Sequence, residues 1–168
     1  MTLQLSVAQL NFTVGDMTGN ARKIIDAART AYQQGARLLV TPELSICGYA
    51  AEDLFLRPSF IKACQEAVAL VQQELADLKD MFVVVGHPSG DDKRTRSVSV
   101  QQRFNMASVF SEGKLVASYA KRELPNYQVF DERRYFIPGH EACVFQVNGV
   151  KIGLLICEDA WFEQPPLD

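Results

Sequence analysis

Short apolar runs with strand character alternate with two amphipathic helical patterns along this 168-residue chain, and this order limits the fold more than any other feature. Residues 3–10 alternate in polarity as a strand does, and residues 37–41 form a short buried run. Between them, turn and N-cap residues at 16–20 begin a helix of about fifteen residues that ends near Gly35. Strands joined through a helix can pair in parallel, so this half of the chain predicts the start of an α/β sheet.

The second half of the pattern combines another helix with strands that are joined by tight turns. After Pro58, apolar residues recur at three- and four-residue spacing, which predicts an amphipathic helix, and the β-branched run MFVVVG follows it. Two predicted hairpins come next: 104–110 joins 114–120 through Ser111-Glu112-Gly113, and 143–147 joins 150–156 through Asn148-Gly149. The chain therefore predicts an α/β fold whose sheet contains both parallel and antiparallel pairs.

Three of the apolar runs end in a chemically reactive side chain. Glu43 follows LLVTP, Lys121 follows LVASYA and Cys157 follows IGLLI. Because ligands bind at the carboxyl ends of strands in open α/β sheets, we expect these three residues to converge on one site. A free thiol has a pKa of about 8.5 and needs a base to become a nucleophile, which Glu43 could provide. The Lys121 ammonium could then stabilise negative charge that develops on a substrate amide or nitrile.

The acidic residues Glu158 and Asp159 directly follow Cys157, in the positions that a helix's first turn favours for acids. We therefore expect Cys157 to lie at a strand-to-helix corner. Helix N–H groups aimed at the thiol would lower its pKa and form half of an oxyanion site.

The four cysteines are widely spaced and include no CxxC pair, which predicts reduced thiols rather than a disulfide framework or a zinc site. Cys64 and Cys143 fall in elements with a core face, and Cys47 is expected to pack near the site without acting in it. Only two histidines accompany them, so no metal cluster is expected.

Composition is that of an ordinary globular protein, with 48% hydrophobic residues, 22% charged residues and a formal charge of −3. This balance favours neither nucleic acid nor an anionic membrane as a partner. No apolar run approaches the roughly 20 residues that span a bilayer, and the start MTLQLSVAQL lacks the features of a signal peptide. The cytoplasm is therefore the expected compartment. The charged segment 91–103 is interpreted as a solvated loop, with an anion-binding patch as the alternative.

Three longer blocks of sequence go beyond these general patterns: PELSICGY at 42–49, YAKRELPNYQVFDERRYF at 119–136 and GLLICEDAW at 153–161. Together they resemble the nitrilase superfamily, which hydrolyses carbon–nitrogen bonds with a Glu-Lys-Cys triad on a four-layer α-β-β-α sandwich. Within that superfamily they look most like the N-terminal glutaminase domain of glutamine-dependent NAD synthetases. The resemblance implies that residues 1–168 form one carbon–nitrogen hydrolase, or glutamine amidotransferase, domain that is incomplete at its C-terminus.

The same resemblance implies a role for individual residues. It makes Glu43 the general base, Lys121 the group that stabilises the tetrahedral intermediate, and Cys157 the nucleophile that forms a γ-glutamyl thioester. Glu132 would be the second carboxylate, which orients the lysine. The implied substrate-binding residues are Tyr49, Tyr127, Glu158 and Trp161.

The implied reaction is the hydrolysis of glutamine to glutamate and ammonia. In the family, the ammonia passes to a C-terminal synthetase domain, which uses ATP and Mg²⁺ to amidate nicotinic acid adenine dinucleotide to NAD. This chain has no SGGxDS phosphate-binding loop, so no cofactor is expected in it, and the synthetase domain is expected as a partner in a longer protein. A homo-oligomer is also expected, because the superfamily tends to oligomerise. Because the resemblance implies that the last strands of the hydrolase domain are missing, the isolated chain is expected to turn over weakly or not at all.

Three other functions remain open from the sequence. A free-standing amidase, carbamoylase or nitrilase would use the same triad on a different substrate. A non-catalytic scaffold module would use the flat faces of the sandwich for assembly, although no packing rule requires Glu43, Lys121 and Cys157 at those strand ends. Redox sensing by Cys157 is the last alternative, and the absence of a nearby resolving cysteine in the sequence argues against it.

Overall fold

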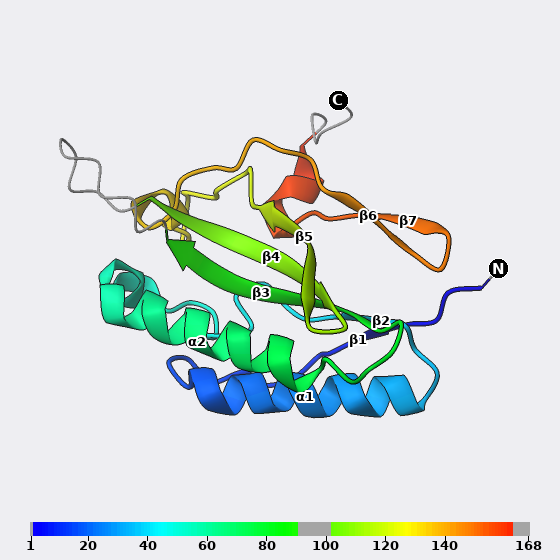
Figure 1. Ribbon diagram of the computed structural model, residues 1–168. Coiled ribbons are helices and arrows are strands. Elements are labelled where there is room, and N and C mark those ends of the chain that lie inside the picture. The colour runs from blue at the N-terminus through cyan, green and yellow to red at the C-terminus, as the bar shows by residue number, and fades with distance from the viewer. Residues whose placement is uncertain (1, 91–101, 163–168) are drawn as a thin grey trace.

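A computed structural model describes residues 2–90 and 102–162 of the chain (Figure 1). Its main feature is a five-stranded sheet with the strand order β1-β2-β3-β4-β5, accompanied by a two-stranded hairpin of β6 and β7. The strands are β1 (Leu5–Val7), β2 (Leu38–Val40), β3 (Phe82–Gly90), β4 (Arg103–Ser111), β5 (Lys114–Ala120), β6 (Val144–Val147) and β7 (Val150–Gly153). The helices are α1 (Met17–Gln33) and α2 (Pro58–Glu74), with the short 3₁₀ helices η1 (Glu52–Leu56), η2 (Glu132–Arg134) and η3 (Cys157–Trp161).

The sheet contains both strand orientations. β1, β2 and β3 pair in parallel, whereas β3, β4 and β5 pair in antiparallel fashion. β5 consequently runs in the same direction as β2 and β3, so the carboxyl ends of these three strands lie at one edge of the sheet. The predicted α/β class and mixed sheet are confirmed.

Both predicted helices begin where local chemistry favours it, and together they cover one face of the sheet (Figure 1). The Asp16 side chain accepts a hydrogen bond from the Gly19 N–H at 2.9 Å and so caps α1. Gly35 follows that helix with a φ of 92°, a conformation that glycine adopts without strain. Pro58 occupies the first turn of α2, where its missing N–H would have no helical partner.

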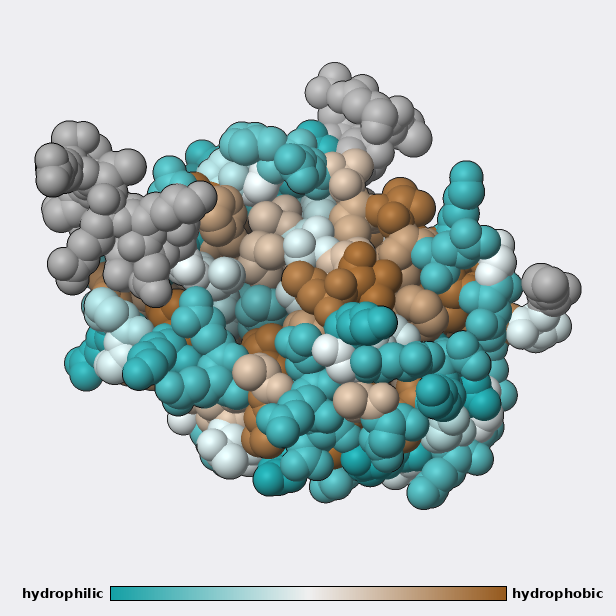
Figure 2. Space-filling view, in the orientation of Figure 1, coloured by the Kyte–Doolittle hydropathy of each residue, from teal (hydrophilic) through white to brown (hydrophobic). Residues whose placement is uncertain are grey.

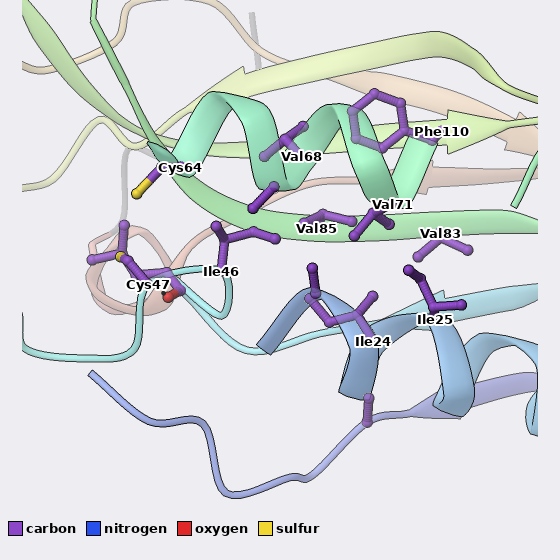
Figure 3. Close-up of a cluster of buried hydrophobic side chains, with 14 of the residues drawn as sticks. Ile24, Ile25, Ile46, Cys47, Cys64, Val68, Val71, Val83, Val85 and Phe110 are labelled. Atoms are coloured by element: carbon purple, nitrogen blue, oxygen red, sulfur yellow. Dashed lines mark hydrogen bonds between the residues drawn. The ribbon is translucent and has the colours of Figure 1, made fainter. Parts of the chain in front are cut away.

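The larger hydrophobic core lies between the two helices and the sheet. Ile24 of α1, Val71 of α2 and Val85 of β3 are fully buried in it (Figure 3). Cys47 and Cys64 belong to the same core and are also fully buried. Their burial agrees with the interpretation of both cysteines as packing residues.

A second, smaller core lies on the opposite face, between the sheet and the β6–β7 hairpin. Val84, Val109 and Tyr119 of the sheet cluster there with Phe145 and Val147 of β6. Residues 2–90 and 102–162 therefore supply three layers, α-β-β, of the expected four-layer sandwich, and they contain no second helical layer. Figure 2 shows hydrophobic atoms gathered over the sheet and hairpin, above a mostly hydrophilic helical layer.

The tight turns follow the sequence prediction, whereas the end of β7 does not. Asn148 and Gly149 have φ values of 48° and 82°, and a type I′ hairpin turn requires positive φ at both positions. β7 ends at Gly153 rather than at 156. The N–H of Ile156 donates to the Asp159 carboxylate at 2.8 Å, so this group is not available to a neighbouring strand.

Two further predictions concern segments rather than the sheet. Positions 91–101 lie outside the described residues, so neither the solvated loop nor the anion-binding patch expected for 91–103 is tested. In the part of the chain that the structure describes, neither helix combines the length and apolar character needed to cross a bilayer.

Candidate active site

Glu43 is held in a tight turn that follows β2. The Thr41 hydroxyl shares a hydrogen bond with the Ser45 hydroxyl at 2.8 Å and accepts another from the Gly86 N–H of β3 at 3.2 Å. A Cβ atom at Gly86 would clash with the carbonyl oxygen of Pro42. The missing side chain at Gly86 therefore lets the turn that carries Glu43 lie directly against the sheet.

Lys121 is the first residue after β5, and its ammonium joins two carboxylates. Nζ donates to Oε1 of Glu43 at 2.7 Å, and to Oε1 and Oε2 of Glu132 at 2.9 and 3.0 Å. The Lys121 side chain is fully buried, and those of Glu43 and Glu132 are 18% and 6% exposed. Three residues that are far apart in the sequence thus form one buried ion cluster at the edge where the strand ends meet.

The charges within the cluster are mutually dependent. Burial alone would lower the pKa of Lys121, but Glu43 and Glu132 outweigh burial and raise it, so the lysine remains an ammonium. Burial and the charge of Glu43 raise the pKa of Glu132, and Lys121 opposes them. Among the described residues, no group of three His, Cys, Asp or Glu side chains is placed to hold a metal ion. Lys121 is the cation that this cluster offers to a developing negative charge.

The Cys157 thiol belongs to the same region, at the start of η3. The charges of Glu43, Lys121 and Glu132 all act on its ionisation, which places the thiol within electrostatic reach of each of them. Cys157 is exposed and has a φ of 47°, in the left-handed region where a residue with a side chain is strained. Strained, exposed turns of this kind are found where enzymes present a nucleophile to a substrate.

The thiol is harder to ionise than that of a free cysteine. Partial burial raises the pKa of Cys157, the Glu43 carboxylate raises it further, and Lys121 only partly offsets them. The expectation that a helix would lower this pKa is wrong, because burial of the thiol and the charge of the Glu43 carboxylate raise it, and η3 is a 3₁₀ helix of 5 residues. A protonated thiol needs a base before it can act as a nucleophile, and Glu43 is the carboxylate with the largest influence on it.

Asp159 ties the turn that carries Cys157 to the chain around Lys121. Its buried carboxylate accepts four hydrogen bonds, from the Tyr119 hydroxyl at 2.8 Å and from the N–H groups of Arg122, Glu123 and Ile156 at 3.1, 2.8 and 2.8 Å. From the sequence alone, Asp159 was predicted only as a first-turn acid. A signal was present, since an acid two residues after the nucleophile cannot be buried without donors.

Asn105 of β4 is a second residue that the sequence analysis missed. It is 1% exposed, and its Nδ2 donates to Oε1 of Glu43 at 2.6 Å. The available signal was a polar amide inside the strand-like run FNMASVF. Such a group requires a partner when it is buried.

The predicted substrate-binding residues fall into three different settings. The Tyr49 hydroxyl donates to Oε1 of Glu132 at 3.3 Å, so Tyr49 lies at the ion cluster. The Tyr127 hydroxyl donates to both carboxylate oxygens of Glu158, at 3.0 and 3.1 Å. Trp161 is 80% exposed. The structure therefore brings Tyr49 to the candidate site and pairs Tyr127 with the residue next to Cys157, while Trp161 lies at the surface.

With this geometry established, the chain can be compared with known proteins. Residues 4–167 match the carbon–nitrogen hydrolase family model. The chain belongs to the carbon–nitrogen hydrolase family. This membership agrees with the superfamily that the three sequence blocks resemble.

Among relatives of this carbon–nitrogen hydrolase, a glutamine-dependent NAD⁺ synthetase from Xanthomonas campestris is 43% identical over 98% of the chain. A second, from Acinetobacter baylyi, is 40% identical over 95% of the chain. The chain spans only 28% of the length of each of these two relatives.

Solved structures give the same relationship. A glutamine-dependent NAD⁺ synthetase from Acinetobacter baumannii, in complex with ADP, superposes with a TM-score of 0.81 at 41% identity, covering 92% of this carbon–nitrogen hydrolase and 28% of that chain. An amidase from Nesterenkonia superposes with a TM-score of 0.76 at 25% identity, covering 96% of this chain and 59% of the amidase. That structure is of a mutant of the amidase, and it shows the result of Michael addition of acrylamide at the active-site cysteine. The superfamily fold is thereby confirmed.

Proposed function

We propose that this chain is the glutamine-hydrolysing part of a glutamine-dependent NAD⁺ synthetase. The main support is the buried cluster in which the Lys121 ammonium bridges Glu43 and Glu132 beside the exposed, strained Cys157. Identities of about 40% to named synthetases support this substrate class over others. Cys157 is then the nucleophile, Glu43 the general base, Lys121 the stabiliser of the oxyanion and Glu132 the carboxylate that orients the lysine.

In the first half of the reaction, Glu43 accepts the thiol proton as Sγ of Cys157 attacks the side-chain amide carbon of glutamine. Negative charge moves to the amide oxygen, where the Lys121 ammonium stabilises it. The proton held by Glu43 passes to the amide nitrogen, the carbon–nitrogen bond breaks, and ammonia leaves. The product on the enzyme is a γ-glutamyl thioester.

In the second half, Glu43 accepts a proton from a water molecule that attacks the thioester. The carbon–sulfur bond breaks, the proton returns to the thiol, and glutamate leaves. The sum is glutamine plus water to glutamate plus ammonia. The raised pKa of Cys157 suits this cycle, because the resting thiol carries the proton that the amide nitrogen needs.

Substrate recognition would use the predicted residues near the thiol. Glu158 is an anion next to Cys157, and Tyr127 fixes both of its oxygens. This arrangement suits the α-ammonium group of glutamine. Tyr49 would close the pocket over Glu132, and Trp161, which is exposed, would contact the substrate from the surface side.

The ammonia would be consumed by a synthetase domain that uses ATP and Mg²⁺ to amidate nicotinic acid adenine dinucleotide. That domain, glutamine and further copies of the chain are the proposed partners, and the cytoplasm is the proposed compartment. Neither ATP nor Mg²⁺ is assigned to this chain.

A chimera tests the proposal. Residues 1–168 replace the matching part of the Xanthomonas campestris relative, and NAD⁺ synthesis is measured with glutamine or with free ammonia as the nitrogen source. We expect the chimera to use both, and Cys157→Ala to lose glutamine use by a factor of about 10³ or more while ammonia use is kept. A chimera that uses ammonia but not glutamine would contradict the proposal.

A free-standing amidase is the second candidate, and the likeness to the Nesterenkonia amidase favours it. It predicts hydrolysis of short aliphatic amides by the 168-residue chain without glutamine competition. The scaffold alternative predicts that Cys157→Ala changes neither activity, and it leaves the buried charges unexplained.

A further inference from the structure

Asn105 contacts both of the residues that the proposed reaction needs most. Its backbone carbonyl accepts a hydrogen bond from the Lys121 N–H at 2.8 Å. Its side-chain Nδ2 donates to Oε1 of Glu43 at 2.6 Å. The residue is 1% exposed, so water does not compete for either contact. One residue of β4 therefore fixes the main chain at Lys121 and the carboxylate of Glu43.

The orientation of the Asn105 amide is determined by its neighbour. If the amide were rotated by half a turn, Oδ1 would face the Glu43 carboxylate and the two oxygens would repel each other. In the observed orientation, Oδ1 is buried and has no hydrogen-bond partner among the described residues. A buried carbonyl without a partner destabilises the fold. The orientation of the amide thus satisfies the Nδ2 contact with Glu43 at the expense of a hydrogen bond to Oδ1.

The contact makes the two oxygens of Glu43 unequal. Oε1 accepts both the Asn105 amide and the Lys121 ammonium, at 2.6 and 2.7 Å. In the part of the chain that the structure describes, no hydrogen-bond donor reaches Oε2. Oε2 is the oxygen that remains able to accept a proton.

We propose that Asn105 is a positioning residue, which holds Glu43 by Oε1 and so presents Oε2 to the thiol of Cys157. Asn105 acts through the carboxylates of the cluster, because its amide donates to Glu43 and also opposes the rise in the pKa of Glu132 that burial causes. The inference rests on the proposed function only for the roles of Cys157 and Glu43, and it is independent of whether glutamine is the substrate.

Several titratable groups surround Glu43, so a test of Asn105 has to measure their combined protonation. Lys121, Glu132, Tyr49 and Cys157 all interact electrostatically with this carboxylate. These groups titrate together. The acid limb, the part of a pH–rate profile where the rate falls as the pH drops, therefore reports protonation of the cluster as a whole. Removing a neutral donor from the charged carboxylate makes the cluster easier to protonate, and the base is then lost at a higher pH.

The experiment follows alkylation of Cys157 by iodoacetamide against pH in the purified chain, with intact mass and peptide mapping as the readout. We expect Asn105→Ala to move the acid limb up by about one pH unit and to slow labelling on that limb about tenfold. Asn105→Asp, which adds a carboxylate beside Glu43, should move the limb further in the same direction. Ser108→Ala is the matched control, because Ser108 is buried on the same strand and bonds to His87 instead.

A second variant separates positioning from folding. Asn105→Leu keeps the branched shape of the side chain and removes the unpaired carbonyl, so we expect it to fold and still to show the shifted limb, while its melting temperature reports the effect of the larger volume. An acid limb that stays in place in Asn105→Leu, or that moves equally in Ser108→Ala, would overturn the proposal. Since iodoacetamide does not resemble glutamine, these results stand whether or not the chain hydrolyses glutamine.

Discussion

Strands β3 and β4 contribute to two buried polar groups: a neutral pair of His87 and Ser108, and Asn105 with the charged cluster that it contacts. Toward the middle of the strands, Nε2 of His87 lies 2.8 Å from Oγ of Ser108, and burial lowers the pKa of His87 to about 4, so the pair is neutral at pH 7. Near the β4 start, Asn105 meets the charged cluster of Glu43 and Lys121. The first pair fills a core without net charge, whereas the second group keeps several charges away from water.

This contrast shows how a functional polar group can be distinguished from a structural one in this fold. A neutral buried pair needs only one hydrogen bond to be tolerated. Buried ions lose more in desolvation than their attraction usually returns, and apolar residues of similar volume often stabilise a protein more. We therefore infer that the Lys121 cluster is retained for chemistry and the His87 pair for packing.

The largest effect is expected for Lys121→Met. It leaves Glu43 and Glu132 buried together without a cation, so the free energy of unfolding should fall by about 3–5 kcal/mol. Labelling of Cys157 by a glutamine analogue should slow by a factor of about 10³. Urea unfolding and the labelling rate measure the two effects.

Neutralising the whole cluster provides the control. Adding Glu43→Gln and Glu132→Gln to Lys121→Met should restore stability without restoring reactivity. If Lys121→Met alone unfolds like the parent chain, the buried charges are not coupled as described.

The next effect concerns His87 and the dependence of stability on pH. The folded pKa is about 4, below the ordinary value of 6.5, so the unfolded state binds more protons between those two values. Stability should therefore be complete above pH 6.5 and fall as the pH drops toward 4, by about 3 kcal/mol from this group. Denaturant titrations at several pH values should show a smaller slope in His87→Gln. An identical slope in both proteins would remove His87 from the explanation.

A smaller effect is expected for Gly86→Ala, which tests the turn that carries Glu43. The new Cβ would press on the Pro42 carbonyl and on the N atom of Leu44, 2.7 Å away, and neither backbone group can move without displacing Glu43. We expect a loss of about 1–3 kcal/mol and slower Cys157 labelling. At Gly153 a Cβ would meet nothing within 4 Å, so Gly153→Ala is the matched control. Equal behaviour of the two variants would contradict the close approach at Gly86.

The smallest effect is expected at the surface. Arg29 and Asp77 form an exposed ion pair at 2.9 Å, and solvent and salt screen such pairs. The melting temperature of Asp77→Asn should match that of the parent within error, at low and high salt. A clear drop at low salt would mean that surface pairs, and not only the buried cluster, carry electrostatic stability here.

The elements that were predictable from the sequence are those set by local pattern. Periodicity placed α1 and α2, turn chemistry placed both hairpins, and the strand ends located Glu43 and Lys121, whereas Cys157 follows β7 only after three residues outside the strand. The roles of these residues stay predictions, although Glu43 and Lys121 are in contact at one sheet edge and their charges both act on the Cys157 thiol.

The remaining features depend on contacts that no local pattern contains. Asn105 meets Glu43 across 62 positions, and Tyr119 meets Asp159 across 40. The direction of the Cys157 pKa shift was wrong for the same reason. It is set by burial and by carboxylates from distant segments rather than by the helix that follows.

The proposed role of Cys157 as the nucleophile of a glutamine site can be tested on the thiol itself. The most direct measurement is intact-mass analysis with peptide mapping after treatment with a glutamine-mimicking diazoketone, on the chain and on the full-length Xanthomonas campestris relative. We predict a single adduct on Cys157 that excess glutamine prevents, with slower labelling in Lys121→Met. Labelling of the relative alone would mean that the pocket needs residues that this chain does not contain. An adduct spread over Cys143 and Cys157, or one that glutamine does not prevent, would contradict the account.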